Sequence, residues 1–151
     1  MTGCRSCELV DRRDAGAAPP WDRILRTPEW DVVHAYGTSI EGWLVLVTRR
    51  HVAALADLTD AESAALGPLV VRVSRALREV VGCVKTYAAQ FAEDPAHPHV
   101  HVHVIPRSAD QPPELCGPRV FSALGGVDEA LCVSEQRRDE IAVRLRELLT
   151  G

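Results

Sequence analysis

The alternation of polar and apolar positions is sharpest between His99 and Ile105. Histidines occupy positions 99, 101 and 103 of this stretch, and valines occupy positions 100, 102 and 104. Because successive side chains of a β-strand point to opposite faces, the pattern predicts a strand with a valine face in the core and a histidine face opposite it. His99 and His103 would lie about 13 Å apart, too far for one metal ion to bind all three histidines at about 2 Å. The three imidazoles are therefore expected to divide their roles; the alternative is an ordinary polar sheet face.

Three further segments are typical of strands. Residues 23–27 and 30–35 fit a short hairpin that turns at Pro28-Glu29. Residues 43–48 form an unbroken apolar run, as expected of a buried strand, and residues 84–91 return to a strand pattern before the loop 92–98. Residues 37–42 are polar and bounded by glycines, so we expect a turn there.

Two segments have the periodicity of helices. Thr59 and Glu62 have the spacing of a capping box, and an apolar stripe at three- and four-residue steps follows them: Leu66, Leu69, Val73, Leu77 and Val80. Gly67-Pro68 is expected to kink this long helix or delay its start. Ser134 can cap a C-terminal helix whose inward side chains would be Ile141, Leu145, Leu148 and Leu149. The order of elements predicts an α+β domain with an antiparallel sheet, one long helix and a C-terminal helix.

Length and composition limit the class of protein. A chain of 151 residues, 46% hydrophobic and 25% charged, is typical of one soluble globular domain. Its net charge of -4 argues against non-specific nucleic-acid binding, which needs a basic face. No apolar run approaches the roughly 20 residues of a membrane span, and the stretch from Met1 to Arg13 lacks the apolar segment of a secretory signal. We therefore expect a cytoplasmic protein without membrane or nucleic-acid partners.

The cysteines suggest a metal rather than disulfides. Their number, five, is odd, and without a secretory signal a disulfide framework is not expected. Cys4 and Cys7 have the spacing of one half of a structural zinc site. The other three are isolated along the chain and fit the behaviour of small buried apolar residues.

The histidine strand, continued by Pro106 and Arg107, resembles the signature of the histidine-triad (HIT) superfamily of nucleotide hydrolases and transferases. The similarity extends to the segment 42–47, to His51, to the long helix and to Gln90. It implies a single HIT-like domain over residues 1–151 that pairs as a homodimer. Within this domain, residues 1–20 would form an N-terminal zinc and loop segment, residues 108–133 an extended loop and residues 134–150 the C-terminal helix.

The resemblance also implies an enzyme that acts at an α-phosphate, in dinucleoside polyphosphates or nucleoside phosphoramidates. His101 would be the nucleophile and would form a nucleotidyl-histidine intermediate that water resolves. His103 would hydrogen-bond a phosphate or bridging oxygen, and the His99 carbonyl would accept from the other ring nitrogen of the nucleophile. Gln90 and Arg107 would contact the phosphate; the alternatives are a polar edge-strand residue for Gln90 and a solvated loop arginine for Arg107.

A zinc site follows from the same resemblance. Zinc-containing relatives, including galactose-1-phosphate uridylyltransferases, place ligands at positions that correspond to Cys4, Cys7, His51 and His99. Four protein ligands complete a tetrahedron, so the zinc would be structural rather than a water activator. The alternative is a pair of free thiols with His51 capping a loop.

Several positions depart from the family pattern. Trp43 stands where many relatives have a histidine, Thr48 replaces a common proline, and Ala35 or Tyr36 lies near the usual residue for the ribose hydroxyls. We interpret His97 as a loop residue, because Pro98 interrupts the ladder, and His34 as a strand-surface histidine. These departures leave a second hypothesis, a nucleotide-sensing protein of weak activity with structural zinc. A third is a purely structural zinc protein.

Overall fold

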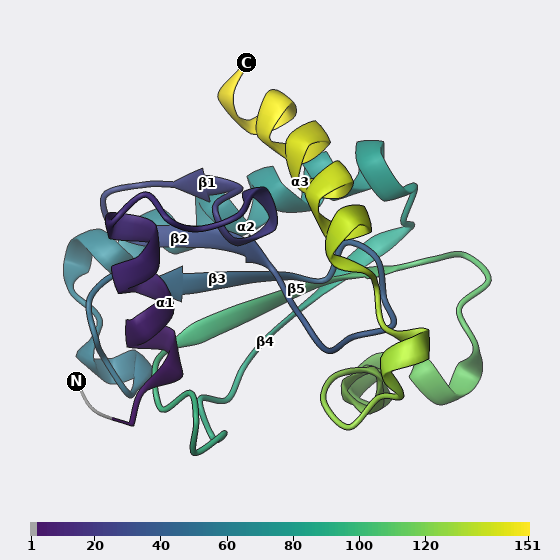
Figure 1. Cartoon of the computed structure of the whole chain (residues 1–151), viewed down its shortest axis with the longest axis horizontal. Coiled ribbons are helices and arrows are strands. Elements are labelled where there is room, and N and C mark those ends of the chain that lie inside the picture. The colour runs from purple at the N-terminus through teal and green to yellow at the C-terminus, as the bar shows by residue number, and fades with distance from the viewer. Residues whose placement is uncertain (1–2) are drawn as a thin grey trace.

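A five-stranded antiparallel sheet with the strand order β1-β2-β3-β5-β4 organises the chain (Figure 1). Its strands are β1 (Leu25–Arg26), β2 (Trp30–His34), β3 (Leu44–Thr48), β4 (Lys85–Gln90) and β5 (His101–Arg107), and its helices are α1 (Arg5–Asp14), α2 (Asp60–Val81) and α3 (Glu135–Thr150). The computed structural model describes residues 3–151, so Met1 and Thr2 of the predicted segment 1–20 lie outside it. The α+β prediction is confirmed, including the hairpin of β1 and β2.

The two faces of the sheet differ as the alternation of β5 predicts. Val100, Val102 and Val104 are buried in the main core, together with inward residues of β2, β3, α2 and α3. The opposite face carries the odd-numbered positions of β5 and a smaller apolar cluster: Ala35, Trp43, Ile105, Val120 and Ala123. One face therefore stabilises the fold against α2 and α3, while the histidine face is available for a site.

The long helix begins where its capping box places it. The Thr59 hydroxyl accepts from the backbone N–H of Glu62, and the Glu62 carboxylate accepts from the backbone N–H of Thr59. Because α2 starts at Asp60 and includes Pro68, the proline does not delay it as proposed. In α3 the inward assignment holds for Ile141, Leu145 and Leu149 but is wrong for Leu148, which is half exposed.

Helix α1 lies within the segment expected to be zinc site and loop. Cys4 is its N-cap, and its Sγ accepts from the backbone N–H of Cys7. Figure 1 shows α1 beside the ends of β2 and β3. Arg13 fixes its other end, donating from a fully buried guanidinium to Asp22 and Asp31. Buried charges need such partners, so this ion cluster ties α1 to the sheet.

The segment 108–133 is not simply extended, because it contains short 3-10 helices at residues 113–115, 117–123 and 129–131. The second of these, η4 (Gly117–Ala123), supplies Val120 and Ala123 to the smaller apolar cluster. Figure 1 places this segment at the end of the sheet away from α1. Within residues 3–151, no helix combines the length and the apolar character that crossing a membrane requires.

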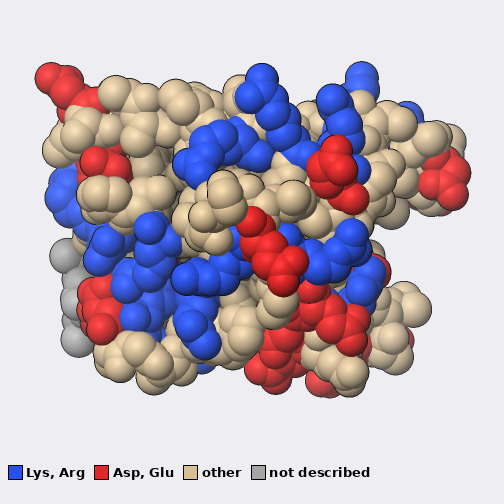
Figure 2. Space-filling model, turned by 90° about the horizontal axis from the view of Figure 1, so that it is seen from above, with Lys and Arg blue, Asp and Glu red and all other residues tan. Residues whose placement is uncertain are grey.

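Charges are unevenly spread on the face over which α3 runs, where Figure 2 shows arginine and lysine gathered in groups beside separate acidic groups. Several arginines of the two long helices bind backbone carbonyls at element ends. Arg72 donates to Leu149 and Arg144 donates to Val80. These arginines therefore connect α2 to α3 in a chain whose net charge is negative.

Candidate functional site

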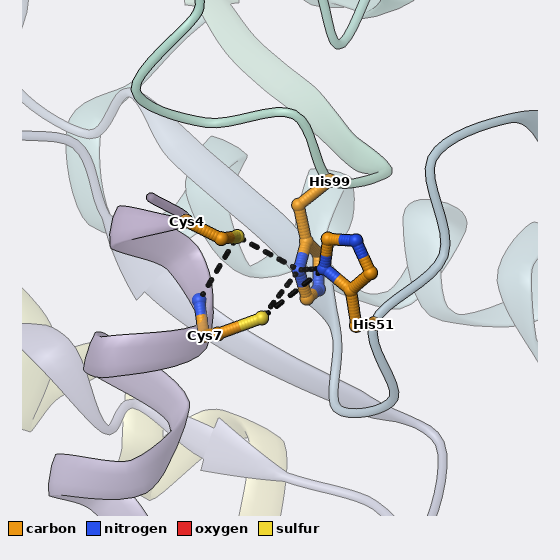
Figure 3. A group of neighbouring side chains, drawn as sticks. All are labelled: Cys4, Cys7, His51 and His99. Atoms are coloured by element: carbon orange, nitrogen blue, oxygen red, sulfur yellow. Dashed lines mark hydrogen bonds between the residues drawn. The ribbon is translucent and has the colours of Figure 1, made fainter. Parts of the chain in front are cut away.

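Four potential metal ligands converge between α1 and the ends of two strands (Figure 3). Cys4 and Cys7 come from the start of α1, His51 follows β3, and His99 precedes β5. The Nδ1 atom of His99 lies 3.6 Å from the Sγ atom of each cysteine and 3.2 Å from Nδ1 of His51, which lies 3.1 Å from Sγ of Cys7. The structure thus gathers all four predicted ligands.

Their spacing fits a tetrahedral ion. Zinc bonds of about 2.0 Å to nitrogen and 2.3 Å to sulfur imply tetrahedron edges of about 3.3 to 3.8 Å. Four of the six separations are 3.1 to 3.6 Å, close to these edges, and all four ligand atoms lie within 4.8 Å of one another. Burial and the neighbouring Cys4 thiol raise the pKa of Cys7 to about 11, so Cys7 needs a cation to be held as a thiolate.

His99 connects this cluster to the histidine strand. Its Nε2–H donates to the carbonyl of Thr48 at 2.7 Å, which leaves the Nδ1 lone pair directed at the cluster. Its own backbone carbonyl accepts from Nδ1 of His101, also at 2.7 Å. One residue therefore contributes a side chain to the cluster and a backbone acceptor to the adjacent imidazole.

The hydrogen bond to the His99 carbonyl determines the state of His101. A carbonyl only accepts, so Nδ1 of His101 carries a proton, and in the neutral imidazole Nε2 has the lone pair. The ring is partly exposed and borders the cavity described below.

His103 is a buried imidazole beside His101. Its ring centroid lies 5.0 Å from that of His101 and 5.0 Å from that of Phe121. Trp43 donates from its indole N–H to Nδ1 of His103 at 3.0 Å. Burial, with a smaller effect from His101, lowers the pKa of His103 to about 3, so the imidazole is neutral at physiological pH.

A cavity of about 350 Å³ opens over these histidines. A row of ring contacts crosses it from Trp21 through Tyr36, His97, His101 and His103 to Phe121, with neighbouring centroids 5.0 to 6.4 Å apart. The remaining lining is largely apolar, with Leu9, Val33, Val45, Val47 and Leu124 among its residues. Arg13 is the only Lys or Arg among the described lining residues, and its guanidinium is already bonded to Asp22 and Asp31.

The two residues proposed to contact phosphate do not join this cavity. Gln90 pairs with Val102 across β4 and β5, which puts its side chain on the sheet face opposite His103. Arg107 lies at the far end of β5 and donates to the carbonyls of Ser108 and Ala109. Neither belongs to the cavity lining.

His97 joins the site although its sequence context indicated only a loop. Its Nδ1 lies 2.8 Å from the Ser6 hydroxyl, its Nε2 lies 3.0 Å from the Tyr36 hydroxyl, and its ring is 6.2 Å from that of His101. It does lie in the loop before β5. The signal that could have identified it is the two-residue step from His97 to His99, which continues the alternation across Pro98.

His34 corrects another expectation, because it is fully buried rather than on the strand surface. Its Nδ1–H donates to the Ala35 carbonyl at 2.6 Å, and its Nε2 accepts from the backbone N–H of Gly42 at 2.9 Å. Burial lowers the pKa of His34 to about 4. This histidine is a satisfied structural residue that closes the turn between β2 and β3.

Comparisons with known proteins agree with the fold and the triad. Residues 20–110 match the family model described as HIT domain. No curated protein matches the sequence significantly.

Solved structures give the same result for the architecture. A zinc-bound histidine triad family protein from Mycobacterium smegmatis aligns with a TM-score of 0.67 at 21% identity, over 97% of this chain and 93% of that one. A hypothetical histidine triad nucleotide-binding protein from Sulfolobus tokodaii aligns with a TM-score of 0.70 at 13% identity, over 95% of this chain and 92% of that one. A histidine triad protein from Bradyrhizobium japonicum aligns with a TM-score of 0.64 at 26% identity, over 84% of this chain and 89% of that one.

Proposed function

This chain belongs to the HIT domain family, and on that premise we propose that it hydrolyses or transfers nucleotidyl groups through His101. The substrate would be a nucleoside phosphate derivative, either a dinucleoside polyphosphate or a nucleoside phosphoramidate. The observation that carries the proposal is the 2.7 Å contact from Nδ1 of His101 to the His99 carbonyl. It leaves Nε2 as a neutral nucleophile at the cavity, as covalent catalysis requires.

The reaction proceeds in two displacements at the α-phosphorus. In the first, the Nε2 lone pair of His101 forms a nitrogen–phosphorus bond while the bond to the leaving group breaks. In the second, water adds to phosphorus and the nitrogen–phosphorus bond breaks, releasing the nucleoside monophosphate and a proton. His103 lies close enough to donate a hydrogen bond to the phosphate or to the departing group.

The cavity lining supports a nucleoside as the remainder of the substrate. Apolar side chains and the rings of Trp21 and Tyr36 adjoin the histidines, and aromatic rings form favourable contacts with flat heterocycles. The lining arginine is already paired, so phosphate charge would be met by imidazole, hydroxyl and backbone N–H donors.

We further propose that Cys4, Cys7, His51 and His99 hold a structural zinc ion. The spacing of their ligand atoms supports this assignment, as does the bound zinc in the Mycobacterium smegmatis relative. The ion would fasten α1 to the loops before and after the strands and keep the His99 carbonyl in position. Elemental analysis of metal-replete protein should give close to one zinc per chain, and well under one would contradict the assignment.

The function is tested by intact mass spectrometry after brief mixing with a fluorogenic adenosine phosphoramidate. Wild-type protein should gain one nucleotidyl group, and His101→Ala should gain none. If no nucleobase in a panel of phosphoramidates and dinucleoside polyphosphates yields an adduct, the enzymatic proposal fails. Nucleotide binding without an adduct would then favour the hypothesis of a nucleotide-sensing protein. The observation that specifically supports this hypothesis is that Ala35 lies near the expected ribose contact.

A further inference from the structure

One of the positions that depart from the family pattern, Trp43, contacts His103 directly. It lies immediately before β3, is fully buried, and points its indole N–H at Nδ1 of His103. The two rings meet edge to face with centroids 5.7 Å apart. The indole is thus both a neighbour of His103 and a bonded partner of one defined ring nitrogen.

The indole fixes which partner of this hydrogen bond is the donor. Trp has a donor and no acceptor in its side chain, so Nδ1 of His103 must accept. A neutral imidazole that accepts at one nitrogen carries its proton on the other. The proton of His103 is therefore on Nε2, and among the described residues no protein atom accepts from that nitrogen while the ring borders the cavity.

We propose that Trp43 is a positioning residue that locks His103 in the tautomer whose Nε2–H is directed at the bound phosphate or leaving group. The inference rests on the proposed function for the role of that donor. His103 keeps its proton throughout, and it stabilises developing negative charge by hydrogen bonding rather than by proton transfer.

Among the groups around His103, Trp43 is the one that sets its tautomer. Val45 on β3 and Ala89 on β4 stand opposite His103 in the sheet register, and Phe121 of η4 covers the ring edge. His101 is the one titratable side chain whose ring contacts that of His103 among the described residues, and its Nδ1 is already bonded to a carbonyl. The cavity also includes His97, Glu93 and Asp94 in its lining.

Removing the indole N–H should allow His103 to change its tautomer. In Trp43→Phe an aromatic ring is kept at this buried position, although it is smaller than the indole, and Nδ1 of His103 becomes a buried acceptor without a donor, which is unfavourable. The imidazole can relieve this by moving its proton to Nδ1, and the cavity then faces a lone pair where phosphate needs a donor. We expect kcat/KM to fall about tenfold, the effect of losing one hydrogen bond.

The decisive measurement is the tautomer itself, read from long-range proton–nitrogen correlation spectra of the histidine rings in ¹⁵N-labelled, zinc-replete full-length protein. Wild type should show His103 protonated on Nε2, and Trp43→Phe should shift it toward Nδ1. Phe121→Leu is the matched control, because it removes another ring that contacts His103 without removing a donor, and its His103 should keep the wild-type tautomer.

A double-mutant cycle adds a kinetic criterion. In a His103→Gln background the side-chain amide supplies an N–H donor whatever its neighbour, so Trp43→Phe should cause no further loss of kcat/KM. An unchanged His103 tautomer in Trp43→Phe, or an Nδ1–H tautomer already in wild type, would overturn the inference. The spectra need no substrate, so they decide this question even if the protein fails to form the nucleotidyl adduct.

Discussion

At the scale of single residues, the histidines of this sheet are distinguished by what fixes each ring nitrogen. A carbonyl accepts from Nδ1 of both His34 and His101, whereas the indole of Trp43 donates to Nδ1 of His103. The free nitrogen of His101 is consequently a lone pair, and that of His103 is a donor. Identical side chains on one short stretch thus acquire complementary chemistry from neighbours that the alternation of the sequence does not specify.

His34 should make the fold sensitive to mild acid. Its Nε2 already accepts from Gly42, so a protonated ring would face a backbone N–H donor, and burial lowers its pKa to about 4. The unfolded chain binds this proton near pH 6.5 and the folded chain does not. The contribution of His34 to the free energy of unfolding is therefore fully present above about pH 6.5. It falls as the pH drops toward 4, by about 2 kcal/mol between pH 7 and 5.

Urea unfolding at pH 7 and pH 5 checks this expectation. His103, whose pKa is also lowered, contributes in the same direction, so the informative quantity is the difference between wild type and His34→Gln. The variant should lose distinctly less stability than wild type over this interval. Equal losses would show that His34 does not set the acid sensitivity.

Residue patterns predicted ligands better than they predicted substrate contacts. The Cys-x-x-Cys spacing indicated Cys4 and Cys7, and the family resemblance added His51 and His99. The strand alternation placed His101 and His103 on one face. Gln90 and Arg107 were placed by order along the chain, but a strand residue faces the site only if its register does, and Gln90 pairs with Val102. His34 was misjudged because its ring nitrogens bond the backbone of Ala35 and Gly42, contacts that the strand alternation does not specify.

At the scale of elements, α1 depends on tertiary contacts at both of its ends. One end is fixed by the cysteine cluster and the other by the ion pairs of Arg13. Helix formation by ten residues is marginal without such contacts. This explains why its sequence, rich in arginine and acidic residues, did not indicate a helix by periodicity.

Chelation of the proposed zinc should therefore loosen α1 selectively. We expect faster hydrogen exchange of the amides of residues 5–14 after treatment with a strong chelator, and little change in the core-facing half of α2. Because Ser6, Leu9 and Arg13 line the cavity, nucleotide affinity should fall together with the hydrogen-exchange protection of α1. Exchange of α1 that does not respond to metal removal would contradict this link.

The capping box of α2 gives a second prediction at this scale. Thr59→Ala removes the side-chain acceptor for the Glu62 amide and should destabilise the protein by about 1 kcal/mol in urea unfolding. Ser63→Ala is the matched control, since the Ser63 hydroxyl donates only to Asp60 within the exposed first turn. Comparable losses for both variants would show that the cap itself contributes nothing specific.

Strands and long helices were predictable because each has its own period, but the segment 108–133 has none. Its short 3-10 helices are determined by packing of Val120 and Ala123 against Trp43 and Ile105. Pro112 and Pro113 lie within the segment expected to be an extended loop, whereas Pro113 begins a 3-10 turn. Proline fixes its own φ angle and suits the first position of such a turn equally well.

At the scale of the whole molecule, the two faces of the sheet have separate tasks. The face under α2 and α3 forms the main core, and the arginines beside them are occupied with backbone carbonyls. The other face holds the cavity and the metal ligands. This separation lets residues of the site face change, as Trp43 and Ala35 of the smaller apolar cluster illustrate, without disturbing the packing that maintains the strand order.

The strand order leaves β4 as an edge, and we expect it to pair with β4 of a second copy. The edge contains a single charged residue, Lys85, and is flanked by the exposed apolar side chains of Val84 and Phe91. An unpaired edge with so little charge readily accepts another strand, and antiparallel pairing of two copies would join two sheets. Light scattering coupled to size exclusion should give the mass of a dimer.

Ala88→Asp tests the location of that interface, because Ala88 is exposed in the middle of β4 and two such carboxylates would meet across the symmetry axis. The variant should be monomeric, whereas Leu131→Asp, at an exposed apolar residue of another segment, should remain dimeric. Since His101 and His103 lie on β5 rather than on the β4 edge, the monomer should still form the nucleotidyl adduct. A dimeric Ala88→Asp would exclude the β4 edge, and loss of the adduct in a folded monomer would show that the partner copy completes the site.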